Sequence, residues 1–181
     1  MKELSLNILD VAKNSVSAGA THIEILLNED TQGMLTLAIN DNGCGMSEEV
    51  LLGVTNPFYT TRKTRKVGMG LPLLKMAAEQ TGGQLCITSS TSEEDHGTRL
   101  TATFDTKSID FMPIGDIIST ICILIAGSPE IDFSFADNSP RGSVRLETAE
   151  LKAVLGGISL AEPEIQQWMK EYLEEQYQTL K

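Results

Sequence analysis

An acidic residue followed by two spaced glycines stands at the end of a predicted strand. Residues 34–39 alternate between apolar and other side chains, and Asp41, Gly43 and Gly45 follow directly. Glycine carries no Cβ and adopts positive φ freely, so a flat ring could approach the backbone closely here. The Asp41 carboxylate could then accept a hydrogen bond from an exocyclic amine. The same residues also form an ordinary turn, so this motif alone leaves a turn and a ligand site both open.

A second group of polar side chains lies on the first predicted helix, residues 2–18. Asn7, Asp10, Asn14 and Ser17 follow one another at helical spacing, along the edge of an apolar face. Such a column can be plain solvent exposure. It contains no Lys or Glu, however, which solvated helix faces usually carry. The pattern therefore makes these side chains candidates for a site.

Two further glycines, Gly68 and Gly70, open a predicted apolar helix over residues 71–80. A helix that begins this way presents backbone N–H groups and the positive end of its dipole, which together favour a phosphate. The preceding residues, 53–67, predict a mobile loop. That loop concentrates positive charge in an otherwise acidic chain, which fits either a solvated tip or a contact with a polyanion. Its basic residues are Arg62, Lys63, Arg65 and Lys66.

The remaining patterns predict the elements that must position these residues. Alternation predicts further strands at 21–27, 85–89 and 99–104, and residues 48–52 predict a short helix. Beyond residue 104 the patterns predict helices at 113–126, 148–155 and 163–176 and a hairpin from strands 131–135 and 143–146. In the last helix we expect Trp168 to be buried and Tyr177 to be exposed.

Composition limits the classes of partner. The chain has 181 residues, 41% of them hydrophobic, and its net charge of −11 disfavours non-specific binding to nucleic acid or to an anionic membrane. Its longest apolar run, residues 117–126, is too short to span a bilayer. Three cysteines without metal-ligand spacing are typical of a reducing compartment, and the N-terminus shows no secretory signal. We therefore expect a soluble, cytoplasmic protein.

In order and spacing, the motifs resemble the GHKL superfamily of ATP-binding domains. That superfamily includes sensor histidine kinases, anti-sigma kinases, type II topoisomerases, MutL-type repair proteins and heat-shock chaperones of the ninety-kilodalton class. The resemblance covers residues 1 to about 104. Residues 10–14 look like its N box, 41–45 its G1 box, 56–61 the F box of histidine kinases, 68–71 its G2 box, and Gly97-Thr98 its last box.

The resemblance implies a fold and a ligand. The implied fold is a two-layer α/β sandwich of the Bergerat type, with one mixed sheet and helices on one face. It would form a domain over residues 1–104, followed by a small acidic α+β part at 105–181. Residues 1–104 carry 12 acidic and 8 basic side chains, whereas residues 105–181 carry 13 and 6. The implied ligands are ATP and Mg²⁺.

The resemblance also implies a role for each candidate residue. Asn14 would bind Mg²⁺, and Asp10 would be the catalytic base. Asp41 would hold the adenine amine, with Thr98 supporting the adenine end. The remaining implied contacts to the nucleotide are those of Gly43, Gly45, Gly68, Gly70 and Leu71, with Lys63 as a catalytic cation and Arg65 and Lys66 as further lid residues near the γ-phosphate.

Two departures from the family pattern leave the activity open. Many ATPases of this superfamily have Glu where this chain has Asp10, so hydrolysis is expected to be slow or absent. No segment resembles a phospho-acceptor helix, and His22 and His96 are expected to be structural. One hypothesis is therefore phosphotransfer to a separate protein, or slow ATP hydrolysis. The alternative is an ATP-gated binding module that docks a protein partner through the lid and the C-terminal part. A homodimer is compatible with both.

Overall fold

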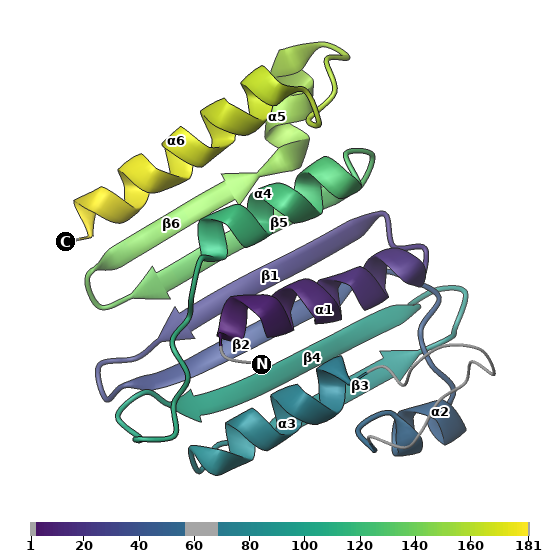
Figure 1. Ribbon diagram of the computed structural model, residues 1–181. Coiled ribbons are helices and arrows are strands. Elements are labelled where there is room, and N and C mark those ends of the chain that lie inside the picture. The colour runs from purple at the N-terminus through teal and green to yellow at the C-terminus, as the bar shows by residue number, and fades with distance from the viewer. Residues whose placement is uncertain (1–2, 57–68, 181) are drawn as a thin grey trace.

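The computed structural model describes residues 3–56 and 69–180, and its strands form one mixed sheet (Figure 1). The strands are β1 (His22–Glu29), β2 (Met34–Asp41), β3 (Leu85–Ser90), β4 (Gly97–Asp105), β5 (Asp132–Ser139) and β6 (Gly142–Glu147). Their order across the sheet is β3-β4-β2-β1-β5-β6. The β1 and β5 strands run parallel, whereas the other neighbouring pairs are antiparallel.

The helices gather largely on one face of this sheet. They are α1 (Leu4–Ser17), α2 (Glu48–Gly53), α3 (Gly70–Gln80), α4 (Ile117–Gly127), α5 (Thr148–Leu155) and α6 (Pro163–Thr179). Figure 1 shows α1, α3, α4 and α6 side by side in front of the strands. This arrangement confirms the predicted two-layer α/β sandwich. Among the described residues, no helix has the length and apolar character needed to cross a membrane.

The period-2 pattern of the strands explains the core. Alternate residues of β1 and β2 are buried, and the intervening ones are partly exposed on the opposite face. Burial of each such aliphatic side chain stabilises the fold by about 1.5–3 kcal/mol. The buried residues of these two central strands are Ile23, Ile25, Leu27, Leu35, Leu37 and Ile39.

Helix α1 is fixed at both ends. Its first backbone N–H groups, those of Leu4 and Ser5, donate to the carbonyl oxygens of Pro113 and Ile114 at 3.0 and 2.8 Å. These bonds satisfy donors that a helix start otherwise leaves unpaired. After the helix, Gly19 adopts φ +74°, the left-handed conformation that commonly follows a helix C-terminus. The side chains along α1 are thereby held in a defined position over the sheet.

Helix α4 begins at Ile117, later than the prediction of residue 113. The carbonyl groups of Pro113 and Ile114 are bound to α1, and Gly115 has φ +80°, which a right-handed helix does not contain. The Asp116 carboxylate then accepts a hydrogen bond from the Ser119 N–H at 2.9 Å and caps the helix. Hydrogen bonds from Ser119 lower the pKa of Asp116.

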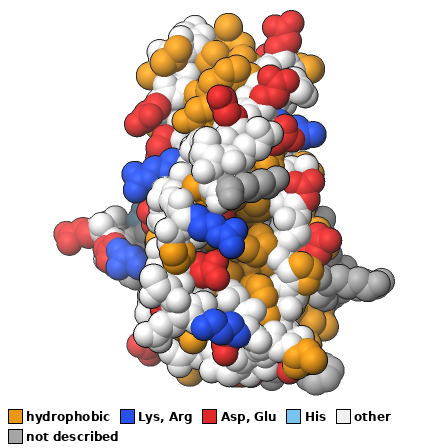
Figure 2. Space-filling view, turned by 90° about the vertical axis from the view of Figure 1, so that its left-hand side faces the viewer, with side chains coloured by type: hydrophobic (Ala, Val, Ile, Leu, Met, Phe, Trp, Pro, Cys, Tyr) orange, Lys and Arg blue, Asp and Glu red, His pale blue; other side chains and the backbone are white. Residues whose placement is uncertain are grey.

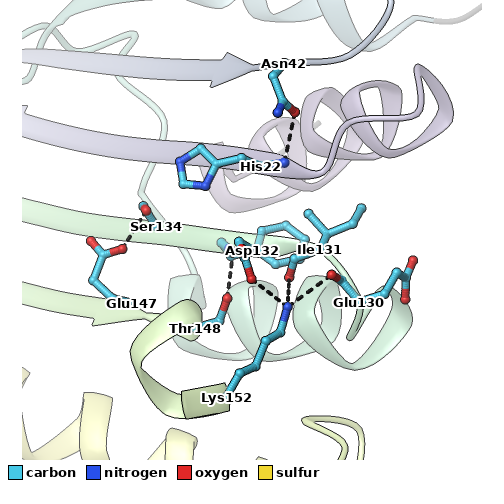
Figure 3. Close-up of polar contacts among 10 residues, drawn as sticks. His22, Asn42, Glu130, Ile131, Asp132, Ser134, Glu147, Thr148 and Lys152 are labelled. Atoms are coloured by element: carbon cyan, nitrogen blue, oxygen red, sulfur yellow. Dashed lines mark hydrogen bonds and ion pairs between the residues drawn. The ribbon is translucent and has the colours of Figure 1, made fainter.

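The C-terminal strands continue the same sheet. Strand β5 pairs with β1 from His22–Asp132 to Asn28–Asn138. Lys152 on α5 fastens the start of β5, because its ammonium donates to the carbonyl oxygens of Glu130 and Ile131 and to the Asp132 carboxylate (Figure 3). The division of the chain near residue 104 stays a prediction, since the sheet runs across it.

Two predictions about α6 are wrong. Trp168 is 46% exposed, whereas Tyr177 is partly buried and its hydroxyl donates to Asp137 Oδ2 at 2.6 Å. The inward stripe of the helix consists of Ile165, Met169 and Leu173 at four-residue spacing, and the next position in that series is Tyr177. Trp168 lies one residue off the stripe.

Candidate functional site

The Asp41 carboxylate lies at the end of β2 and is oriented from two sides. The buried Ser15 hydroxyl of α1 donates to Oδ2 at 2.6 Å, and the Gly43 N–H donates to Oδ1 at 2.9 Å. A carboxylate offers about four lone-pair sites, so these two bonds leave room for a further donor. Asp41 is therefore a positioned acceptor between the first helix and the sheet.

The glycines after Asp41 have a structural reason of their own. Gly45 has φ +72°, and a Cβ there would lie 1.8 Å from the Ser90 carbonyl oxygen. A Cβ on Gly43 would lie 2.8 Å from the Cβ of Ala18. Close packing of the chain against itself thus requires both glycines. Their contact with a ligand stays a prediction.

Hydroxyl groups gather beside Asp41. Thr98 on β4 is the register partner of Asp41, and its Oγ1 lies 2.8 Å from the Ser89 Oγ on β3. Ser89 also accepts from the Met46 N–H and donates to the Gly97 carbonyl. A polar pocket of about 220 Å³ opens at this end of the sheet, and its lining includes Asp41, Ser89 and Gly97.

Two side chains hold the loop that contains Gly43. The Asn42 side-chain oxygen accepts from the N–H groups of Thr21 and His22, both at 2.9 Å, so it ties the loop to the start of β1. Figure 3 shows the bond to His22. The His96 Nδ1 lies 2.7 Å from the Gly43 carbonyl oxygen. Both contacts restrain the backbone that carries the candidate acceptor.

Asp10 and Asn14 form a second group on α1. They are one helical turn apart and exposed. Helix α3 begins beside Asp10, since a Cβ on Gly70 would lie 3.2 Å from the Asp10 Cβ. Within the described part of the chain, no hydrogen bond or ion pair engages either side chain. Asn7, in the same column, is fully buried against Met112 instead.

The structure therefore gathers the candidates into two groups joined by α1. One group contains Asp41, Gly43, Gly45 and Thr98; the other contains Asp10, Asn14 and Gly70, and Leu71 packs against the core nearby. The four other candidates, Lys63, Arg65, Lys66 and Gly68, lie outside the described residues. No trio of His, Cys, Asp or Glu within residues 3–56 and 69–180 is placed to hold a metal. The side-chain amide oxygen of Asn14 is a hard ligand of the kind that Mg²⁺ prefers. Few protein ligands are needed, because this ion keeps several of its waters.

Sequence reasoning missed two residues of this region, Ser15 and Ser89. Ser15 has the helical spacing of the apolar face, and only its contact with Asp41 identifies it as a supporting donor. Ser89 sits in an ordinary strand pattern. Their partners lie 26 and 9 residues away in sequence, so no local signal could have indicated the contacts.

A model of the family described as histidine kinase-, DNA gyrase B-, and HSP90-like ATPase matches residues 1–108. The tetrathionate sensor histidine kinase TtrS of Salmonella typhimurium is 31% identical over 87 residues, 48% of this chain and 14% of TtrS. Sporulation kinase E of Bacillus subtilis is 32% identical over 98 residues, 54% of this chain and 13% of that kinase. The match thus spans a small part of these relatives.

A solved structure extends the likeness beyond the family-matched residues. The Aquifex aeolicus MutL ATPase domain complexed with ADP superposes with a TM-score of 0.55, over 86% of this chain and 70% of that domain. The sequence identity is 14%, so this likeness concerns the fold alone.

Proposed function

Because this chain belongs to the family of histidine kinase-, DNA gyrase B-, and HSP90-like ATPases, we propose that it binds Mg-ATP and either phosphorylates a separate protein or hydrolyses ATP slowly. The observation that carries this proposal is the Asp41 carboxylate, held by Ser15 and Gly43 with capacity for one more donor. An adenine amine is a donor that suits it. The polar groups of both sets of candidate residues suit an adenine nucleotide.

In this proposal the two groups of candidate residues would hold opposite ends of the nucleotide. Asp41 and Thr98 would hold the adenine end. The backbone N–H groups at the start of α3, where Gly70 stands, would meet phosphate oxygens, because a helix N-terminus favours negative charge. Lys63, Arg65 and Lys66 would bring positive charge to the γ-phosphate.

Asn14 and Asp10 would act at the phosphate end. Asn14 would hold Mg²⁺, which supplies positive charge that stabilises phosphoryl transfer. Asp10 would orient a water molecule or accept its proton. Their spacing of one helical turn on α1, with Gly70 beside Asp10, supports this proposal.

A specific observation favours a second candidate, an ATP-gated binding module without catalysis. A general base is usually oriented by a partner, and Asp10 has none among the residues that the structure describes. In this version nucleotide binding orders the lid, and a protein partner docks on the lid and the C-terminal part. A cytoplasmic protein, alone or as a homodimer, fits either version.

Binding and turnover separate these versions. Isothermal titration with Mg-ATP tests binding, and γ-labelled ATP tests phosphate release and the labelling of partner proteins. Asn14→Ala is expected to weaken Mg-ATP more than metal-free ATP. Absence of any adenine-nucleotide binding would overturn both versions.

Variants at Asp10 test the base. Asp10→Asn is expected to keep binding and abolish hydrolysis, whereas Asp10→Glu is expected to raise turnover if the shorter side chain only lacks reach. Background turnover with Glu favours the binding module. Hydrolysis by Asp10→Asn at the parent rate would remove Asp10 from the role of base.

A further inference from the structure

Helix α6 exposes a pair of stacked aromatic rings. The ring centroids of Trp168 and Tyr172 lie 5.0 Å apart with an interplanar angle of 10°, and the residues are 46% and 38% exposed. Stacking fixes both rings, so little side-chain conformational entropy of Trp168 and Tyr172 is lost when a partner covers them. Trp and Tyr are also the residues that most often contribute strongly to protein interfaces.

Acidic side chains flank these rings. Glu164 lies four residues before Trp168, and Glu171 and Glu175 lie three residues after Trp168 and Tyr172, respectively. We call these five residues the aromatic face. In residues 3–56 and 69–180, none of the three carboxylates forms an ion pair; Glu171 accepts only from the Gln167 amide. The face is therefore negative and has no cation of its own.

The one basic residue of α6 lies on the other flank. The Lys170 ammonium is 3.9 Å from Glu174, and both groups lie near Cys122 of α4. Residues 105–181 as a whole carry 13 acidic and 6 basic side chains. Figure 2 shows hydrophobic side chains gathered toward the end of the molecule that carries α5 and α6, with acidic ones beside them.

At the neighbouring sheet edge, α6 already engages the backbone of one residue of β6. The Arg145 N–H on β6 donates to the Gln176 side-chain oxygen at 2.8 Å, and the Gln176 amide donates to the Arg145 carbonyl at 2.9 Å. This side chain occupies the hydrogen-bonding groups that an added strand would use at Arg145. The aromatic face beside it offers side chains instead of backbone groups to a partner.

We propose that the aromatic face binds a basic segment of a partner protein. An arginine or lysine of that segment would lie on the Trp168 ring and pair with Glu171 or Glu175. A cation over an indole ring is attracted by its quadrupole, and adjacent carboxylates strengthen the attraction. Charge complementarity selects a basic partner over an acidic one.

Trp168 is the only tryptophan of the chain, so its emission reports on this face directly. The probe is a short fluorescein-labelled peptide of alternating arginine and serine, added to the full chain without nucleotide. We expect saturable anisotropy together with a change in Trp168 emission. The triple change Glu164→Gln, Glu171→Gln and Glu175→Gln is expected to weaken binding roughly tenfold, as is Trp168→Leu measured by anisotropy.

A matched triple change removes the same charge elsewhere: Glu79→Gln, Asp110→Asn and Glu150→Gln, all at exposed positions. It is expected to leave the affinity within about twofold of the parent. An equal loss in both triple variants, or binding without a change in Trp168 emission, would show that the face is not the site. Sedimentation showing a dimer whose formation alters the emission would assign the face to a second copy and overturn the proposal. Loss of ATP binding would not affect this test.

Discussion

Ser15 shows how one unremarkable residue can set the geometry of a candidate site. Its hydroxyl donates to Asp41 while the Gly43 N–H donates to the other carboxylate oxygen. Sequence patterns predicted Asp41 as an acceptor, because its position after a strand and before glycines is local information. They could not predict Ser15, because a helix and a strand end must first be brought together in space.

We expect Asp41→Asn to weaken ATP binding by roughly ten- to a hundredfold, since a hydrogen bond to a charged group contributes about 1.5–3 kcal/mol. The new amide must also present its NH₂ group to Ser15, to the Gly43 N–H or to the ligand. Isothermal titration measures the change, with Asp110→Asn at an exposed position as control. An unchanged affinity would mean that Asp41 serves only the turn.

Tyr177 gives a residue-scale prediction with a pH dependence. Burial raises the pKa of the Asp137 carboxyl above its usual value, and the hydrogen bond from Tyr177 lowers it in part. An acid with a raised folded pKa holds its proton longer in the folded state. Its contribution to the free energy of unfolding therefore falls as pH rises from about 3.8, the usual value, through the raised pKa.

Tyr177→Phe removes the donor and lets the pKa of Asp137 rise further. We expect a loss of about 1–2 kcal/mol in the free energy of unfolding at neutral pH, and a smaller loss below the usual pKa, where both states are protonated. Urea titrations across this range measure the difference. Tyr172→Phe, on the exposed ring, is the control and is expected to change little. A loss independent of pH would show that the Tyr177 hydroxyl does not alter the pKa of Asp137.

At the scale of elements, sequence periodicity predicted the type of every helix and strand described above. It failed at α4, whose start depends on carbonyl groups that α1 captures. It also failed within α6, because the apolar and aromatic residues there fit two adjacent stripes. The stripe that faces inward contains the buried Met169 and Leu173, and it continues to Tyr177, whose hydroxyl donates to Asp137. Local pattern thus gives the existence of an element, and tertiary contacts give its limits and its buried face.

Lys152→Met tests how α5 is held against β5. The three donors of this ammonium meet two carbonyl oxygens and one carboxylate, and Lys152 is only partly exposed. We expect the variant to lose about 1–2 kcal/mol in the free energy of unfolding, because those acceptors lose their partner. Lys170→Met, at an exposed pair 3.9 Å apart, is expected to lose less than about 0.5 kcal/mol. Equal losses would mean that the contacts at Lys152 contribute no more than a surface pair.

At the scale of the whole molecule, the sequence indicated a C-terminal hairpin but not its place. Nothing in residues 131–146 specifies pairing with β1, because either sheet edge of the first part would accept a hairpin. The structure places β5 beside β1, and α4 beside α1 (Figure 1). The helix with Asp10 and Asn14 is consequently flanked by an element from each part of the chain.

This arrangement gives the last prediction, a truncation after Ser108 that keeps the family-matched residues. The fragment loses the parallel partner of β1 and the capping bonds from Pro113 and Ile114 to α1. We expect it to fold, because β2 and α3 still cover the core beside β1, but to unfold at a lower urea concentration than the full chain. Its affinity for ATP is expected to fall less than its stability, since Asp41, Ser15 and Thr98 are all retained. Urea titration followed by circular dichroism, together with isothermal titration at low temperature, measures both quantities. A fragment without a cooperative transition would show that residues 105–181 complete one domain and would remove the proposed boundary near residue 104.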